Sequence, residues 1–181
     1  MTQPSFFGYG SLVNLATHDY AAPRRATLRG WRRVWHGTHL REVSYLSVIR
    51  DDATTLHGVI AGVPNDDWAA LDAREAAYQR HDVSHAVDHS APTAVYQVRP
   101  EHIAPKDAHP ILLSYVDVVV QGYLHLFGED GVAHFFDTTD GWDAPILNDR
   151  ADPIYPRHQT LTKQELGIVD DNLAAVMQKA E

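Results

Sequence analysis

The sequence contains no cysteine among its 181 residues. This absence excludes disulfides, a thiol nucleophile and any zinc or iron–sulfur site held by cysteine. No apolar run approaches the roughly 20 residues that a membrane-spanning helix requires. The first residues, MTQPS, lack the basic segment with which a secretory signal begins. We therefore expect a cytoplasmic protein that does not cross a membrane.

Lysine is also scarce. Three lysines and twelve arginines stand against 24 acidic residues, which gives a formal net charge of −9. This balance disfavours general binding to nucleic acid or to an anionic membrane surface. Hydrophobic residues make up 44% of the chain, and a chain of this length can bury enough surface for a core of its own. We expect residues 1–181 to form one domain.

The apolar pattern contains more strands than helices. Short β-branched or alternating runs predict strands at 6–9, 26–36, 44–50, 57–63, 83–87 and 94–98. These runs and the helices described next show no regular βαβ rhythm. We therefore expect an α+β fold, a single compact domain in which a mixed or antiparallel sheet curls into a small β-barrel with flanking helices.

Two segments have helical spacing. The first is 65–79, with Asn65 as the expected N-cap. The second is the C-terminal segment, where Thr162 and Glu165 have the spacing of a capping box ahead of an apolar stripe. Residues 111–127 fit either a strand or a helix, and 137–160 are broken by proline and glycine, so we expect them to be irregular.

One carboxylate lies on the apolar face of the first expected helix. At 100° per residue, Trp68, Leu71, Glu75 and Tyr78 fall within an arc of about 80°. A poorly solvated carboxyl has a raised pKa, which suits a general base at neutral pH. The alternative is that Glu75 pairs with an arginine or lies at the rim of the core.

The second candidate feature follows the first strand. Gly8 and Gly10 flank Tyr9, and two glycines let the backbone turn sharply and approach a ligand closely. Successive N–H groups in such a turn can bind an anion such as a small carboxylate. The segment lacks the third glycine of a dinucleotide fingerprint and the Gly-Lys-Ser/Thr element of a P-loop. The alternative is an ordinary connection between a strand and a turn.

Taken together, four short segments resemble the gamma-glutamylcyclotransferase-like family (AIG2-like and ChaC-like proteins). Segment 7–12, FGYGSL, resembles the signature loop of the family, and 28–33, LRGWRR, resembles the segment that follows it. Segments 57–60, HGVI, and 71–75, LDARE, resemble the family's strand and the helix that bears its catalytic glutamate. The resemblance is strong from residue 6 to about 78 and is traceable to 157.

The resemblance implies a reaction and assigns residues to it. The α-amine of a γ-glutamyl compound attacks its own γ-carbonyl, which gives 5-oxoproline and a released amine or amino acid. Such an enzyme is of the acyltransferase or C–N lyase type. Glu75 matches the catalytic base, and the reaction requires no metal and no organic cofactor. The residues that match the family's substrate-binding loop are Tyr9, Gly10, Ser11 and Leu12.

Further pocket residues are less securely placed. Tyr78 is the best candidate for a tyrosine that lines the pocket, because it follows Glu75 by one turn of the expected helix; Tyr115 and Tyr123 are weaker candidates. Arg33 either faces the site or covers the edge of the sheet, and we favour the sheet edge. Ala76 and Ala77 follow Glu75, where several relatives have a glycine, so the specificity of a subfamily does not transfer.

Histidine is abundant, with 12 residues. On a helix, His81, His85 and His89 would share a metal-binding face. Alternating valines favour a strand instead, on which the outer two would lie about 27 Å apart at ~3.3 Å per residue, too far to bind one ion. The acidic segment 137–152 lacks the spacing of an EF-hand loop, so we expect a rim over the cavity. Trp142 either caps the substrate there or anchors the core.

The sequence leaves the function within a narrow range. We expect a γ-glutamyl cyclotransferase that acts on a small γ-glutamyl substrate, and glutathione, γ-glutamyl amino acids and γ-glutamyl amines all remain open. One alternative is a non-catalytic module that binds γ-glutamyl or carboxylate compounds on the same fold. Another is a related acyl-transfer enzyme that removes a γ-glutamyl group from a biosynthetic intermediate. A monomer and a homodimer both fit the sequence.

Overall fold

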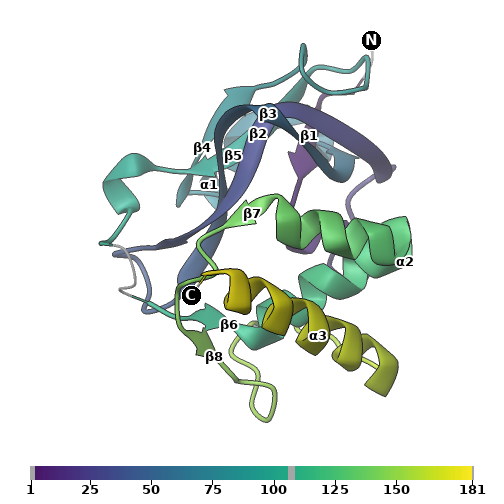
Figure 1. Cartoon of the computed structure of the whole chain (residues 1–181). Coiled ribbons are helices and arrows are strands. Elements are labelled where there is room, and N and C mark those ends of the chain that lie inside the picture. Colours follow the sequence, from purple (N-terminus) through teal and green to yellow (C-terminus); the bar gives the residue numbers. More distant parts are fainter. Residues whose placement is uncertain (1–2, 106–108, 181) are drawn as a thin grey trace.

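The computed structural model describes residues 3–105 and 109–180. It contains a six-stranded mixed sheet, a separate two-stranded sheet and three α-helices (Figure 1). The strands are β1 (Ser5–Gly8), β2 (Arg24–Gly37), β3 (Ser44–Gly62), β4 (Tyr78–Asp82), β5 (Thr93–Val98), β6 (Ile111–Leu112), β7 (Thr139–Asp140) and β8 (Ile146–Leu147). The helices are α1 (Trp68–Arg74), α2 (Leu113–Asp137) and α3 (Lys163–Ala180).

The large sheet has the order β4-β5-β1-β3-β2-β7. β1 lies in its interior, antiparallel to β3 and parallel to β5. β2 and β3 form a long antiparallel hairpin with a bulge between Arg29 and Trp31, where Gly30 has a φ of +81° that favours glycine. The expected α+β fold with a mixed sheet is therefore confirmed, and the strand expected at 44–50 joins the one at 57–63.

The small β-barrel that we expect of this sheet does not close among the described residues, because β4 and β7 end the strand order. An irregular segment after β4 partly bridges the gap. The N–H of Arg29 donates to the Ala86 carbonyl, at 3.0 Å, and the N–H of Asp88 donates to the Thr27 carbonyl, at 3.3 Å. The segment therefore lies against β2 without continuing the ladder.

The strand expected at 83–87 is wrong. β4 ends at Asp82, whose carboxylate accepts the N–H and the hydroxyl of Ser84, at 2.9 and 2.6 Å. This local turn gives the backbone an alternative to the ladder, and side chains of this type commonly end strands in that way.

The structure agrees with the prediction for the C-terminal helix and differs from the prediction for the helix at 65–79. α3 begins with the expected capping box, in which the Glu165 N–H donates to Thr162 Oγ1 and the Thr162 N–H donates to the Glu165 carboxylate, at 3.2 and 2.7 Å. The helix expected over 65–79 is wrong at both ends, because α1 spans only Trp68–Arg74 and its N-cap is Asp67. The ambiguous segment 111–127 is a two-residue strand followed by α2.

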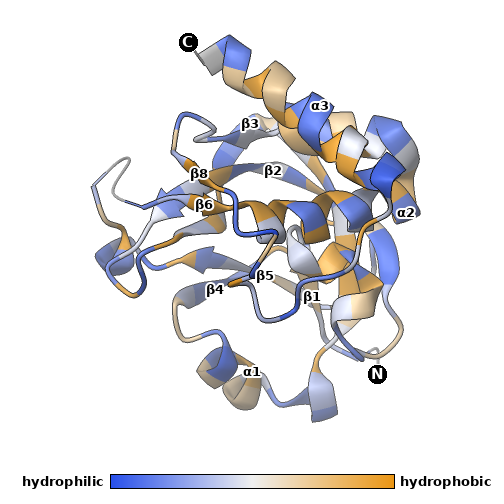
Figure 2. Cartoon of the chain, turned by 90° about the horizontal axis from the view of Figure 1, so that it is seen from below, coloured by the Kyte–Doolittle hydropathy of each residue, from blue (hydrophilic) through white to orange (hydrophobic). Residues whose placement is uncertain are grey.

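The main core lies between the sheet and the helices. Figures 1 and 2 show α2 and α3 side by side and α1 apart from them, next to β4. Phe7, on one face of β1, belongs to the main core with α2, and Phe6, on the other face, packs in a smaller cluster with Leu71 of α1. β1 is therefore buried on both faces and fixes the loop that follows it.

No helix in the described part of the chain is long and apolar enough to span a bilayer. The expectation that residues 1–181 form one domain stays a prediction. Residues 1–2, 106–108 and 181 lie outside the described residues.

Candidate active site

The loop after β1 folds back tightly on itself. A Cβ atom at Gly8 would lie 2.5 Å from Leu12 Cβ, and one at Gly10 would lie 2.6 Å from the hydroxyl oxygen of Tyr115. Both contacts are closer than a real Cβ atom tolerates, so a side chain at either position would force Leu12 or Tyr115 to move. A 3-10 turn, Ser11–Val13, follows directly.

The backbone donors of this loop are only partly used. The Ser11 N–H reaches the Tyr115 hydroxyl at a long 3.4 Å. No hydrogen bond joins the N–H of Gly10 or of Leu12 to another group in the described part of the chain. Neighbouring unpaired N–H groups form a site for an anion or for a developing oxyanion.

The Tyr9 side chain supports this loop from inside the protein. It is 7% exposed, and its hydroxyl donates to the Tyr96 carbonyl at 2.7 Å. The Tyr9 carbonyl accepts from Arg33 Nε at 2.8 Å and from the Tyr123 hydroxyl at 3.0 Å. In a trans peptide the carbonyl of one residue and the N–H of the next point in opposite directions. The N–H of Gly10 therefore points away from Arg33.

Arg33 does not cover the sheet edge, so that expectation is wrong. Its side chain is fully buried and also donates to the His57 carbonyl at 2.6 Å, to Thr138 Oγ1 at 2.7 Å and to the Tyr123 hydroxyl. Burial lowers the pKa of Arg33, but an arginine stays protonated in proteins. A buried positive charge therefore lies directly behind the loop.

Glu75 is the C-cap of α1 and not a residue of the helix interior. Its N–H donates to the Leu71 carbonyl at 2.9 Å, and its own carbonyl accepts the Tyr78 N–H at 2.8 Å. Within the described residues, no hydrogen bond or ion pair involves its carboxylate. Burial raises the pKa of the Glu75 carboxyl, and the charges of Arg74 and Arg157 oppose this shift.

The helix ends at this point because a long-range strand pair begins. Tyr78 pairs with Val98 at the start of the β4–β5 ladder, and the Arg99 N–H donates to the Ala77 carbonyl at 3.1 Å. We expected Tyr78 to lie one helical turn beyond Glu75. The structure places it on a strand instead. Its hydroxyl nevertheless donates to the Leu46 carbonyl at 3.3 Å, and burial raises its pKa well above the ordinary value.

Two adjoining cavities meet at Glu75. The smaller, of about 120 Å³, is lined by the loop residues Tyr9, Gly10, Ser11 and Leu12. The larger, of about 640 Å³, opens on the other side. The residues common to both linings are Leu46, Glu75, Tyr78, Tyr115 and Arg157. The structure thus brings every expected site residue to one place, with Tyr115 among them, whereas Tyr123 lies behind the loop.

One wall of the larger cavity, which includes Tyr155 and Arg157, was not predicted from the sequence. This wall follows the segment expected to form a rim. Two anchors hold it: the Asp149 carboxylate accepts the N–H and hydroxyl of Ser114 at 2.8 and 2.5 Å, and Arg150 forms a two-point ion pair with Asp117 at 2.8 and 2.7 Å.

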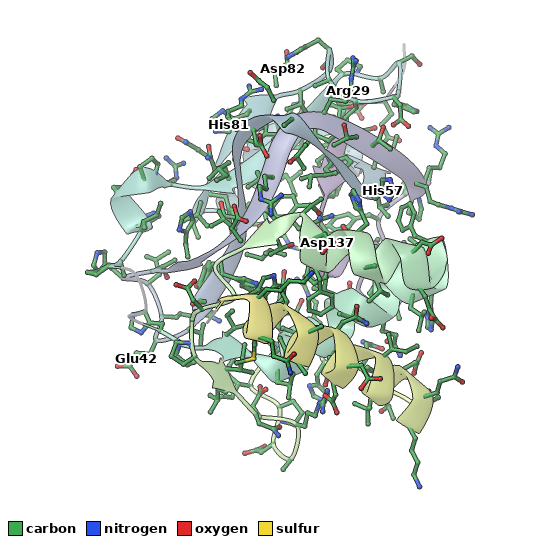
Figure 3. The ribbon with its side chains drawn as sticks, viewed as in Figure 1. Arg29, Glu42, His57, His81, Asp82 and Asp137 are labelled. Atoms are coloured by element: carbon green, nitrogen blue, oxygen red, sulfur yellow. The ribbon has the colours of Figure 1, made fainter. Side chains whose placement is uncertain are left out.

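The remaining candidates lie away from the cavities. His81 is on β4, His85 is in the following turn, and His89 Nε2 lies 2.9 Å from Arg24 Nη2. Figure 3 shows His81 at the end of the sheet farthest from α3. No group of three potential metal ligands occurs within residues 3–105 and 109–180. Trp142 is 4% exposed and stacks on Phe136, so it anchors the core.

The family model "Gamma-glutamyl cyclotransferase, AIG2-like" matches residues 6–115. The chain belongs to this family. The family match covers the loop after β1, the β2–β3 hairpin and Glu75, and it ends at Tyr115. Tyr155 and Arg157 therefore lie outside the matched region. No curated protein matches the chain.

Solved structures share the fold of this AIG2-like chain. YkqA from Bacillus subtilis has a TM-score of 0.60 and 17% identity over 81% of this chain and 57% of its own length, so this chain spans little more than half of that protein. A structure named gamma-glutamyl cyclotransferase has a TM-score of 0.58 and 13% identity, over 94% of this chain and 99% of that one. The uncharacterized protein loc79017 from Homo sapiens has a TM-score of 0.59 and 14% identity, over 92% and 97%. Identities this low show the fold alone.

Proposed function

We propose that the protein is a γ-glutamyl cyclotransferase, which converts a γ-glutamyl compound into 5-oxoproline and a free amine or amino acid. The observation that carries the proposal is the position of the Glu75 carboxylate. It lies without an ion pair where the two cavities meet, and the same small cavity contains the backbone donors of the loop. Membership of the family supports the same reaction.

Glu75 acts as the general base. The α-ammonium group of the substrate is protonated at neutral pH and cannot attack a carbonyl until it loses a proton. A carboxylate with a raised pKa is a stronger base than an exposed one, and burial has that effect on Glu75. The proton that Glu75 takes from the amine is then given to the nitrogen of the leaving group.

The ring closes within one molecule. The α-nitrogen forms a bond to the γ-carbonyl carbon, and the bond from that carbon to the leaving nitrogen breaks. The α-nitrogen loses two protons in all, one before it attacks and one as the ring closes, and the leaving nitrogen gains both and departs as an ammonium group, so the step balances without a cofactor. Holding the two ends of the glutamyl chain in a small cavity reduces the entropic part of the barrier. In this proposal, the N–H groups of Gly10 and Leu12, two residues that line the small cavity, bind the oxyanion of the tetrahedral intermediate or the α-carboxylate.

The direct test is release of 5-oxoproline, measured by mass spectrometry, from a panel of glutathione, γ-glutamyl dipeptides and γ-glutamyl amines. Glu75→Gln keeps the shape of the side chain and removes the base, so we expect turnover to fall by roughly 100-fold or more. The matched control is Glu101→Gln, because Glu101 is an exposed carboxylate whose side chain is 63% accessible. It should retain the wild-type rate.

Two results would overturn the proposal. A folded Glu75→Gln variant with full activity would remove Glu75 as the base. A folded wild-type protein that binds γ-glutamyl compounds and releases no 5-oxoproline would indicate the non-catalytic binding module. The oligomeric state and the location of the protein in the cell stay predictions from the sequence.

A further inference from the structure

The larger cavity differs in chemistry from the smaller one. The smaller cavity is lined by β1, the loop after it and single residues of other segments, whereas the larger is lined by residues of four separate segments. If the glutamyl part occupies the small cavity with its γ-carbonyl near Glu75, the leaving group must extend into the larger cavity. This assignment rests on the proposed function.

The lining of the larger cavity is positively charged in a protein of net charge −9. It contains Arg41, Arg74 and Arg157, and its only carboxylate among the described residues is that of Glu75. Figure 3 shows Glu42, the residue after Arg41, at the outer edge of the molecule, and Glu42 is not part of the lining. A cleft of one sign attracts ligands of the opposite sign.

These three arginines are also available to a ligand. Within the described residues, none of them forms an ion pair with a carboxylate. Arg74 lies over the ring of Tyr20, 5.2 Å from its centroid, and so extends toward the smaller cavity, which Tyr20 lines. Arg157 lines both cavities, whereas Arg41 and Arg74 line only the larger one. Because Arg74 extends toward the smaller cavity over the ring of Tyr20, Arg41 is the cation that only the leaving group meets.

The same cavity offers an apolar surface. Tyr45 stacks on Tyr78 with ring centroids 6.3 Å apart, and Ile154 is 55% exposed although it lines the cavity. The wall with Tyr155 is held by Asp149 and Arg150 before any ligand arrives. A preformed wall loses less conformational entropy on binding than a mobile one.

We infer that the larger cavity is the subsite for a leaving group that carries a carboxylate and an apolar side chain. The preferred substrates are then γ-glutamyl amino acids or short peptides, and γ-glutamyl derivatives of simple amines are poor substrates. The guanidinium of Arg41 provides planar, paired donors that match a carboxylate. The family match ends at residue 115, so the wall of 154–157 is a feature of this chain that the match does not cover.

The test uses three substrates that differ at one group: γ-glutamyl-phenylalanine, γ-glutamyl-phenylalaninamide and γ-glutamyl-phenethylamine. We expect kcat/KM for 5-oxoproline release to be roughly tenfold higher for the carboxylate than for the other two, the scale of one charge-assisted hydrogen bond. Arg41→Gln should abolish most of this preference through KM and leave the rate with phenethylamine as leaving group unchanged. Arg99→Gln, the control at an exposed ion pair with Glu101, should retain the preference.

Dissociation constants separate this inference from the proposed function. They are measured by calorimetry for the same three compounds with Glu75→Gln, which should bind without turnover. If no compound releases 5-oxoproline but the carboxylate still binds tighter through Arg41, the catalytic proposal fails and the subsite stands. Equal dissociation constants, or a preference that persists in Arg41→Gln, would overturn the subsite whether or not the protein is catalytic.

Discussion

Two arginines show how differently this protein uses the same side chain. Arg33 is fully buried, and its guanidinium donates to two backbone carbonyls, a threonine hydroxyl and a tyrosine hydroxyl. Arg41 lies at the rim of the larger cavity, where no described carboxylate pairs with it. The buried charge holds the loop in place, whereas the rim charge is free for a ligand. Arg33 therefore builds the site, and in our proposal Arg41 selects its substrate.

The largest expected difference between the two arginines is the effect of their substitution on the free energy of unfolding. Arg33→Met leaves buried carbonyl and hydroxyl groups without donors, so the free energy of unfolding should fall by about 3 kcal/mol or more. Arg41→Met changes an exposed side chain and should shift the free energy of unfolding by no more than ~0.5 kcal/mol. Urea unfolding followed by tryptophan fluorescence measures both. Similar losses in the two variants would contradict the division of roles.

The loop should tolerate no side chain at Gly10. In Gly10→Ala the new Cβ would lie 2.6 Å from the Tyr115 hydroxyl oxygen, so either the loop or Tyr115 must move. We expect activity to fall by at least ~10-fold, because catalytic donors displaced by about an ångström lose much of their effect. Gly167→Ala on α3 is the matched control, since no heavy atom lies within 4 Å of its Cβ position. That change should leave activity intact and stabilise the helix by about 0.5–1 kcal/mol.

The stability of the folded protein should also depend on pH through His134, a half-buried side chain of α2. Burial, followed by the nearby charges of His57 and Arg33, lowers the pKa of His134 from 6.5 to about 4. The unfolded chain therefore binds more protons than the folded chain between these values, and stability falls as the pH decreases from about 6.5 toward 4. His134→Phe keeps a ring to stack on His57, which lies 4.0 Å away in the native pair, and should reduce this slope. An unchanged slope between pH 6.5 and 5 would contradict the assignment.

The smallest expected effect is that of salt. The preference for a carboxylated leaving group depends on an exposed charge, so raising the ionic strength from about 0.05 to 0.5 M should reduce it a few-fold. The hydrogen bonds of Arg33 are shielded from solvent, so the difference in unfolding free energy between wild type and Arg33→Met should change little. A preference that does not respond to salt would indicate that shape, and not Arg41, selects the leaving group.

Local chemistry could be predicted from the sequence. The capping box of Thr162 and Glu165 and the turn at Gly8, which folds against Leu12, act within a few residues, and the structure has both. The end of α1 could not be predicted, because it depends on pairing of Tyr78 with Val98, 20 positions along the chain. Helical spacing placed Glu75 and Tyr78 on one face, but tertiary strand pairing ended the helix between them.

Long-range contacts also explain why the burial of Arg33 and the wall of the larger cavity could not be predicted from the sequence. Arg33 is buried because its partner Tyr123 lies 90 positions later, and no local pattern marks an arginine that becomes internal. The wall with Tyr155 and Arg157 depends on Asp149 bound to Ser114, 35 positions earlier. The candidate base and loop were therefore accessible from the sequence, and the surroundings that give them their electrostatics were not.

The pH dependence of 5-oxoproline release tests the central claim about Glu75 most directly. We expect kcat/KM to fall on the acid side with an apparent pKa above the ordinary 4.5 of a glutamate. Because the charge of Arg157 lowers the pKa of Glu75, Arg157→Gln should move this limb to higher pH. An acid limb at the same pH in both proteins, or one that persists in Glu75→Gln, would show that another group is the base.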